Sequence, residues 1–156
     1  MYELIKQPER VIADYGKVIE WAPKDADAYA KRGQLEVQTK KYDAAIKDLS
    51  RALELNPKDT ASLRYRAYAF LSKEQWQQAA TDYGAIIKSV PKDEAALEKR
   101  AYVYEKLGQP IPAIADYTSL IEKKPNDGSF IGDAALSIAW LRIMPKPGLT
   151  FARCWN

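Results

Sequence analysis

Histidine is absent from this sequence of 156 residues, and there is only one cysteine, Cys154. Without histidine the chain lacks the commonest general base and metal ligand, and no Ser-His or Cys-His nucleophile pair can form. A single cysteine excludes an internal disulfide and a cysteine-based metal cluster. A catalytic site would have to rely on carboxylates, lysine or tyrosine, and we expect no cofactor and no bound metal.

Long apolar runs and a leader pattern are also missing. No apolar run approaches the ~20 residues that a membrane-spanning helix needs. The first residues, MYELIKQPER, lack the basic-then-apolar order of a signal peptide. These absences favour a cytoplasmic chain without a membrane partner, unless a targeting sequence lies outside these residues.

An excess of one charge occurs only near the C-terminus. The formal net charge is +3, and from residue 142 onward the only charged residues are Arg142, Lys146 and Arg153. Residues 1–141 therefore carry as many acidic as basic side chains and lack the basic surface that phosphate binding requires. Nucleic acid is not an expected partner.

The sequence does contain an internal repeat with a constant step. The triplet Pro-Lys-Asp at 23–25 returns at 57–59 and 91–93, and as Pro-Asn-Asp at 125–127, so one repeat is the step from Pro23 to Pro57. Four registers without an insertion indicate a repeat architecture. The repeat also argues against a metal site at the Asp-Tyr-Gly of residues 14–16, because the same tripeptide recurs at 82–84.

Each unit is predicted to be a pair of short helices. In the central unit apolar residues recur at helical spacing over roughly 60–73 and again over 76–89. Pro91 then ends the second helix, since a proline further inside would lose a backbone hydrogen bond and clash. Asp93 follows as the N-cap of the next helix.

A helix pair that repeats at the step from Pro23 to Pro57 resembles the repeat unit of the tetratricopeptide repeat (TPR) family. The resemblance rests on a series of seven residues in each unit: an aromatic or apolar residue, a small residue, a second aromatic residue, an alanine, an aromatic residue, a small or apolar residue and a closing proline. These are Tyr29, Gly33, Leu35 (one place early), Ala45, Leu49, Ala52 and Pro57, then Leu63, Ala67, Phe70, Ala79, Tyr83, Ile86 and Pro91, then Leu97, Ala101, Tyr104, Ala113, Tyr117, Leu120 and Pro125. Glu36 stands where the first unit is expected to have an aromatic residue.

The resemblance implies an all-α, right-handed solenoid of antiparallel helix pairs, with about three full repeats and partial repeats at both ends. The expected array spans 1–141 and an irregular C-terminal tail spans 142–156. Within the array we expect a partial unit at 1–25, repeats at 26–59, 60–93 and 94–127, and a partial unit at 128–141. The partial units either continue a longer array or cap this one. In the first case the exposed face of the 9–21 helix could drive self-association into a homo-oligomer.

The resemblance also implies a peptide-binding groove on the concave face, which the first helices line. By their phase in the repeat, the candidates are Gln34, Gln38, Arg64, Tyr68, Leu71, Glu98, Lys99, Tyr102 and Glu105. Tyr68 and Tyr102 share a phase and are expected to stack as a short aromatic ladder; the alternative is that they only pack between units.

One TPR subclass holds the C-terminal carboxylate of chaperone peptides with lysine and asparagine residues. The matching positions in this chain are Ala30, Gln34, Tyr65, Ala95 and Lys99. Only Lys99 has a suitable charge, so this clamp is not expected.

Paired charges recur through the array as well. Asp14, Asp48 and Asp82 each precede an arginine at one fixed spacing, and these arginines are Arg32, Arg66 and Arg100. We expect each aspartate on a second helix to pair with the arginine on the next unit's first helix. Asp116 has Ala134 at that spacing, so the series is expected to end there. The alternative is that all these charges are independently solvated.

The function expected from this resemblance is a non-catalytic scaffold or adaptor for protein–protein interaction. It would bind a peptide or helix of a partner protein along the concave face. Two alternatives remain open: a spacer or self-association segment of a larger repeat protein, and an accessory module of a multidomain enzyme.

Overall fold

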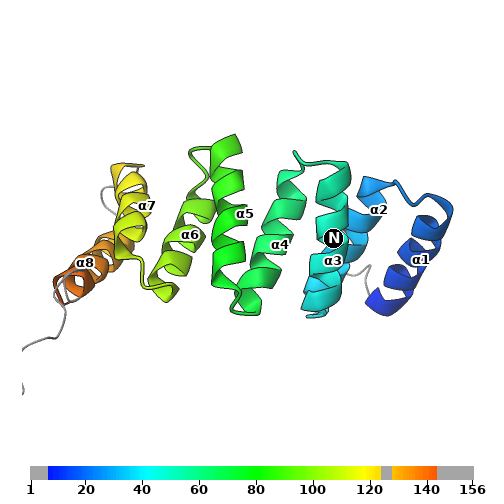
Figure 1. Ribbon diagram of the computed structural model, residues 1–156, viewed down its shortest axis with the longest axis horizontal. Coiled ribbons are helices and arrows are strands. Elements are labelled where there is room, and N and C mark those ends of the chain that lie inside the picture. Colours follow the sequence, from blue (N-terminus) through cyan, green and yellow to red (C-terminus); the bar gives the residue numbers. More distant parts are fainter. Residues whose placement is uncertain (1–6, 124–127, 144–156) are drawn as a thin grey trace, which may run out of the picture.

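In the computed structural model, residues 7–123 and 128–143 are described, and this part of the chain is a row of antiparallel helices joined by short turns (Figure 1). No strand occurs within it. Its helices are α1 (Pro8–Trp21), α2 (Ala26–Gln38), α3 (Tyr42–Leu55), α4 (Thr60–Ser72), α5 (Trp76–Ser89), α6 (Glu94–Lys106), α7 (Pro110–Lys123) and α8 (Gly128–Ile143). Each helix packs against the next one in the chain, which confirms the expected all-α solenoid.

The recurring Pro-x-Asp triplets separate one helix pair from the next, as predicted. Helices α1, α3 and α5 end just before Pro23, Pro57 and Pro91. Asp25 then accepts hydrogen bonds from the amides of Asp27 and Ala28 at 3.0 and 3.1 Å. Asp59 and Asp93 cap α4 and α6 in the same way. These caps satisfy amides that the first turn of a helix leaves without a partner.

The turn inside each helix pair uses a left-handed backbone conformation that the sequence did not reveal. Its φ angle is 60° at Lys40, 57° at Glu74 and 67° at Gly108, and these residues hold the same position in three successive repeats. Only glycine adopts this conformation without a steric cost from Cβ. Two of the three turns therefore place a bulky residue where glycine fits better.

At the centre of each helix pair a small residue on the first helix packs against a larger one on the second. Gly33 lies so close to α3 that an added Cβ would come within 2.7 Å of Leu49 Cγ. The corresponding pairs in the next two units are Ala67 with Tyr83 and Ala101 with Tyr117, and each pair shares one buried cluster. Position x on a first helix therefore meets position x+16 on the second helix of the same repeat.

The two terminal helices are less covered than the others. Helix α1 has no buried residue, and α8 carries several exposed apolar side chains, including Ile131 and Ile138. Helix α8 extends to Ile143, past the boundary expected at 141. The remaining part of the expected tail, from residue 144 onward, lies outside the described residues. None of the described helices is long and apolar enough to span a bilayer.

Candidate functional site

Three pockets follow one another along the side of the solenoid that the first helices line. One pocket lies between α2 and α4, a second between α4 and α6, and a third between α6 and α8. They occur at successive repeats, so a single extended ligand could occupy all of them. Their chemistry changes along the row from polar to apolar.

The middle pocket is aromatic, with a volume of about 260 Å³, and is lined by Tyr68, Leu71, Lys99 and Tyr102. Tyr68 and Tyr102 remain 48% and 39% exposed, so both rings can still contact a ligand. The Nζ of Lys99 lies 3.3 Å from a carboxylate oxygen of Glu98, where both side chains are half exposed. This pocket thus offers two rings beside a half-exposed cation that is paired with Glu98.

The two tyrosines do not stack on each other, which corrects the expected ladder. Tyr68 packs edge-on against Tyr42, with ring centroids 6.5 Å apart, and Tyr102 packs edge-on against Trp76 at 6.3 Å. Tyr42 and Trp76 begin the second helices α3 and α5. Each second helix therefore supports the tyrosine of the following first helix and fixes the direction of its ring.

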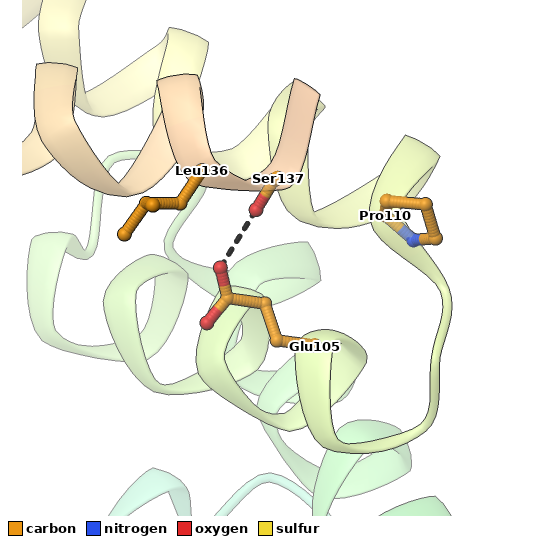
Figure 2. Close-up of a pocket in the computed structure, with 4 residues that line it drawn as sticks. All are labelled: Glu105, Pro110, Leu136 and Ser137. Carbon is orange, nitrogen blue, oxygen red and sulfur yellow. Dashed lines mark hydrogen bonds between the residues drawn. The ribbon is translucent and has the colours of Figure 1, made fainter. Parts of the chain in front are cut away.

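The third pocket is mostly apolar, with a volume of about 350 Å³, and is lined by Glu105, Pro110, Leu136 and Ser137. Figure 2 shows Leu136 and Ser137 on α8 above the carboxylate of Glu105 on α6, with Pro110 to one side. The buried Ser137 hydroxyl donates a hydrogen bond of 2.6 Å to Glu105 Oε1. Glu105 is thereby held at one side of the pocket.

Leu136 and Ser137 were missed by sequence reasoning, although the repeat contained the signal. Gln34, Tyr68, Tyr102 and Leu136 follow one another at a constant step of one repeat, so Leu136 is the next position of that row. Its side chain is largely exposed. The same position of successive repeats on the inner face is thus occupied by a glutamine, two tyrosines and a leucine.

The first pocket is polar, with a volume of about 180 Å³. It is lined by Asp27, Ala30, Lys31, Gln34, Asp59, Ala61, Ser62 and Tyr65. Two aspartates and one lysine in this set contrast with the apolar wall of the third pocket. The row of pockets is therefore polar at its α2 end and mostly apolar at its α8 end.

Arg64, a predicted groove residue, contacts the start of the next repeat's first helix. Its guanidinium pairs with Asp93 through two hydrogen bonds, one of 3.3 Å from Nη1 to Oδ1 and a second from Nη2 to Oδ2. Asp93 is also the N-cap of α6. Arg64 therefore links α4 to the start of α6, and it is not a free cation for a ligand.

The predicted groove residues divide into two sets. Those that line one of the three pockets are Gln34, Tyr68, Leu71, Lys99, Tyr102 and Glu105. Those that line none of these pockets are Gln38, Arg64 and Glu98. Peptide binding by the first set stays a prediction.

The ion pairs differ from the predicted ones in their partners. Arg32 pairs with Asp48, Arg66 with Asp82 and Arg100 with Asp116, and each pair has two hydrogen bonds. The partner of each arginine follows it within the same repeat, whereas the predicted partner precedes it on the second helix of the previous unit. The predicted partner choice was therefore wrong.

The reason lies in the antiparallel helix pair, which brings positions x and x+16 together. Asp14 has no arginine at the matching position, and it pairs with Lys17 at 3.2 Å on the surface. Asp116, at which the series was expected to end, is buried against Arg100. The hydrogen bonds that Arg32 and Arg100 donate to their aspartates raise the pKa of both guanidinium groups above the ordinary value.

Each arginine also contacts the repeat before its own. Arg66 Nη1 donates a hydrogen bond of 3.1 Å to Ser50 Oγ on α3. At the equivalent positions, a Cβ added to Gly16 would lie 3.5 Å from Arg32, and one added to Gly84 would lie 3.6 Å from Arg100. The guanidinium groups thus lie between consecutive second helices, which explains why those helices carry small residues there.

Glu36 is a buried carboxylate at a position where the later repeats have an aromatic ring. It occupies the phase of Phe70 and Tyr104, whose rings lie against Arg66 and Arg100 at 5.8 Å from centroid to guanidinium carbon. Glu36 is 6% exposed, and its Oε2 has no hydrogen-bond partner within the part of the chain that the structure describes. Burial, followed by the charge of Asp48, raises the pKa of Glu36 to about 7.

Comparison with known protein families identifies the family to which the repeats belong. Two family models, both described as tetratricopeptide repeat, match residues 26–59 and 64–128, which together make up more than half of the chain. Among curated proteins, none matches the sequence.

Solved structures share the fold at low sequence identity. The structure of YrrB, "a TPR protein with an unusual peptide-binding site", has a TM-score of 0.79 and 19% identity over 86% of this chain and 70% of its own. A MamA structure gives 0.76 and 21% over 84% and 72%. The first TPR of Spaghetti (RPAP3), bound to an HSP90 peptide, gives 0.65 and 20% over 75% and 93%.

Proposed function

Because the chain belongs to the tetratricopeptide repeat family, we propose that it is an interaction scaffold that binds a partner's peptide or helix along its row of three pockets. The family consists in general of non-enzymatic protein-interaction modules. The observation that carries the proposal is the middle pocket, where Tyr68 and Tyr102 stay half exposed although each ring is held by an aromatic neighbour.

Tyrosines of this kind are suited to binding. Their rings contribute a large contact area with little loss of conformational entropy, and aromatic residues are enriched among the side chains that dominate interface energies. The edge-on contacts with Tyr42 and Trp76 reduce that entropy loss further, because the rings are already oriented.

The change of chemistry along the row defines the ligand. An apolar side chain fits the pocket beside Leu136, and an aromatic or apolar side chain fits between the two tyrosines. An acidic group of the ligand next to that side chain would reach Lys99. Polar side chains fit the pocket with Asp27, Lys31 and Asp59.

Two of the similar structures support peptide binding as the activity. YrrB is described with a peptide-binding site, and the Spaghetti repeat is bound to an HSP90 peptide. We do not propose that this chain binds the same peptide. Of the positions that match the carboxylate clamp, only Lys99 has a suitable charge.

A displayed library of random peptides, selected on the immobilised protein, tests the proposal. The affinity of an enriched peptide is then measured by fluorescence anisotropy against Tyr68→Ala, Tyr102→Ala and the double variant. Each single change is expected to weaken binding by about tenfold or more, as at interface hot spots. Ile111→Ala is the matched control, because Ile111 is an exposed apolar residue on the second helix α7.

Two results would overturn the proposal. One is an enriched peptide that binds the double variant as tightly as the wild type. The other is a selection that enriches no peptide on the wild type relative to the double variant. Circular dichroism of each variant separates lost binding from lost folding.

A further inference from the structure

The last described helix exposes a row of residues that the complete repeats bury. Ile131, Ala135 and Ile138 stand one repeat after Leu97, Ala101 and Tyr104, and Leu97 and Ala101 are buried against the second helix α7. On α8 the row is open: Ile131 is 47% and Ile138 is 41% exposed. We call these three residues the α8 row.

The first described helix has a corresponding open row. Val11, Tyr15 and Val18 stand one repeat before Ala45, Leu49 and Ala52, which are fully buried against the first helix of their repeat. On α1, Val18 is 42% exposed, and Val11 and Tyr15 are only half-buried. We call these three residues the α1 row. Gly16, on another side of the helix, faces Arg32 of α2.

The two rows are the two halves of one repeat interface. The α8 row belongs to a first helix and the α1 row to a second helix, and first and second helices pack against each other in all three complete repeats. We propose that α8 of one copy pairs with α1 of a second copy as a complete helix pair, so that copies of this chain join head to tail.

The register of this pairing follows from the internal repeats. Position x on a first helix meets position x+16 on the second, as Gly33 meets Leu49. In that register Ala135 of one copy meets Tyr15 of the next. This reproduces the alanine–tyrosine pairs that the second and third repeats bury, Ala67 with Tyr83 and Ala101 with Tyr117. A second copy therefore fits the α8 row by residue type at its central position.

The polar part of the interface is incomplete. Asp14 holds the same position in the repeat as Asp48, Asp82 and Asp116. On α8, however, the position of the pairing arginine is occupied by Ala134. Asp14 therefore keeps its surface bond to Lys17, and the joint between copies lacks the ion pair of the complete repeats. We expect association weaker than the packing within a repeat, and strongly dependent on concentration.

The geometry makes the contact heterologous, because two different surfaces meet. Such a contact leaves one α1 row and one α8 row open at the ends of every assembly, so growth continues unless the rotation closes a ring. The three pockets of the inner face are lined by residues outside both rows, so the peptide site and the joint use different side chains. The Tyr68→Ala and Tyr102→Ala variants are expected to associate like the wild type.

Two variants with one blocked surface each test the proposal. Ile138→Lys blocks the α8 row and Val18→Lys blocks the α1 row, and both positions are exposed enough to tolerate lysine in the single chain. In sedimentation velocity, the wild type is expected to gain mass with concentration, while each variant alone stays monomeric. An equimolar mixture of the two variants is expected to form a heterodimer and nothing larger, because one intact surface remains on each chain.

Every other outcome counts against the proposal. A wild type that stays monomeric up to about 1 mM, where even weak interfaces are populated, overturns it. Association of Val18→Lys alone would show that α8 pairs with another α8. Ile111→Lys, on an exposed part of α7 outside both rows, is the control and is expected to associate like the wild type.

A gain of affinity tests the register. Ala134→Arg supplies the missing partner for Asp14 and is expected to tighten association about tenfold, the effect of a charge-assisted hydrogen-bonded pair. Adding Asp14→Ala to the same chain is expected to cancel the gain. Unchanged association of a folded Ala134→Arg chain would show that the two helices do not meet in this register.

Discussion

Arg66 holds Asp82 in a two-pronged ion pair within one repeat, with 2.8 Å from Nε to Oδ2 and 2.7 Å from Nη2 to Oδ1. The carboxylate is buried and the guanidinium is mostly covered. A pair of this kind gains from two charge-assisted hydrogen bonds and costs the desolvation of both charges. Its main consequence is that neither partner can be removed alone without a large loss of stability.

A double-mutant cycle distinguishes this pair from the alternative pairing with Asp48. Asp82→Ala is expected to lower the free energy of unfolding by about 3–5 kcal/mol, because it leaves a largely buried arginine unpaired. Combined with Arg66→Leu, it is expected to show a coupling energy of about 1–3 kcal/mol. Asp48→Ala combined with Arg66→Leu is expected to show almost none. Urea denaturation of the six proteins that make up the two cycles measures their free energies of unfolding, and equal coupling in both cycles would contradict the assignment.

Glu36 makes the stability of the first repeat depend on pH. Its pKa is raised in the folded state to about 7 from an ordinary value of 4.5. A raised pKa means that its contribution to stability is complete below pH 4.5 and is lost as the pH rises through 7. Glu36→Gln removes this titration and is expected to gain about 3 kcal/mol of stability relative to the wild type between pH 4.5 and pH 8, since each pKa unit corresponds to about 1.4 kcal/mol. Parallel pH profiles for the two proteins would refute the prediction.

The left-handed turns within the helix pairs can be improved. Glu74→Gly is expected to raise the free energy of unfolding by about 0.5–1 kcal/mol, since glycine avoids the Cβ clash at φ 57° and the gain exceeds its extra entropy in the unfolded chain. Gly108→Ala, at φ 67°, is expected to lower it by about 1 kcal/mol. Urea midpoints that move in the opposite directions would show that the turns do not carry this strain.

Three helical glycines are expected to respond to alanine in two different ways. Gly16→Ala and Gly84→Ala place Cβ at 3.5 and 3.6 Å from an arginine nitrogen, an ordinary contact, so the helix propensity of alanine adds about 0.5–1 kcal/mol of stability. Gly33→Ala is expected to be destabilising, because its Cβ would lie 2.7 Å from Leu49 Cγ in the core. Thermal melts of the three variants provide the measurement. A stabilised Gly33→Ala variant would mean that Leu49 on α3 can move away from the added Cβ at little cost in free energy.

The helices and their ends could be predicted because their causes are local. A proline that ends a helix and an aspartate that caps the next act within a few residues, so the reading of 60–73 and 76–89 agrees closely with α4 and α5. The row of inner-face residues at a step of one repeat was also visible, although it was followed only as far as Tyr102 and not to Leu136. The edge-on support of Tyr68 by Tyr42 depends on how neighbouring repeats pack, which no local pattern contains.

The ion pairs show most clearly where sequence reasoning ends. Every arginine in the series lies between two aspartates that are one repeat apart, as Arg66 lies between Asp48 and Asp82. Periodicity alone therefore cannot choose between them. The sequence by itself determined the repeat, the helix boundaries and the positions that the complete repeats bury, since these follow from hydrophobic period and capping. Only the tertiary structure decided which aspartate each arginine binds, because antiparallel packing inside a helix pair brings x and x+16 together.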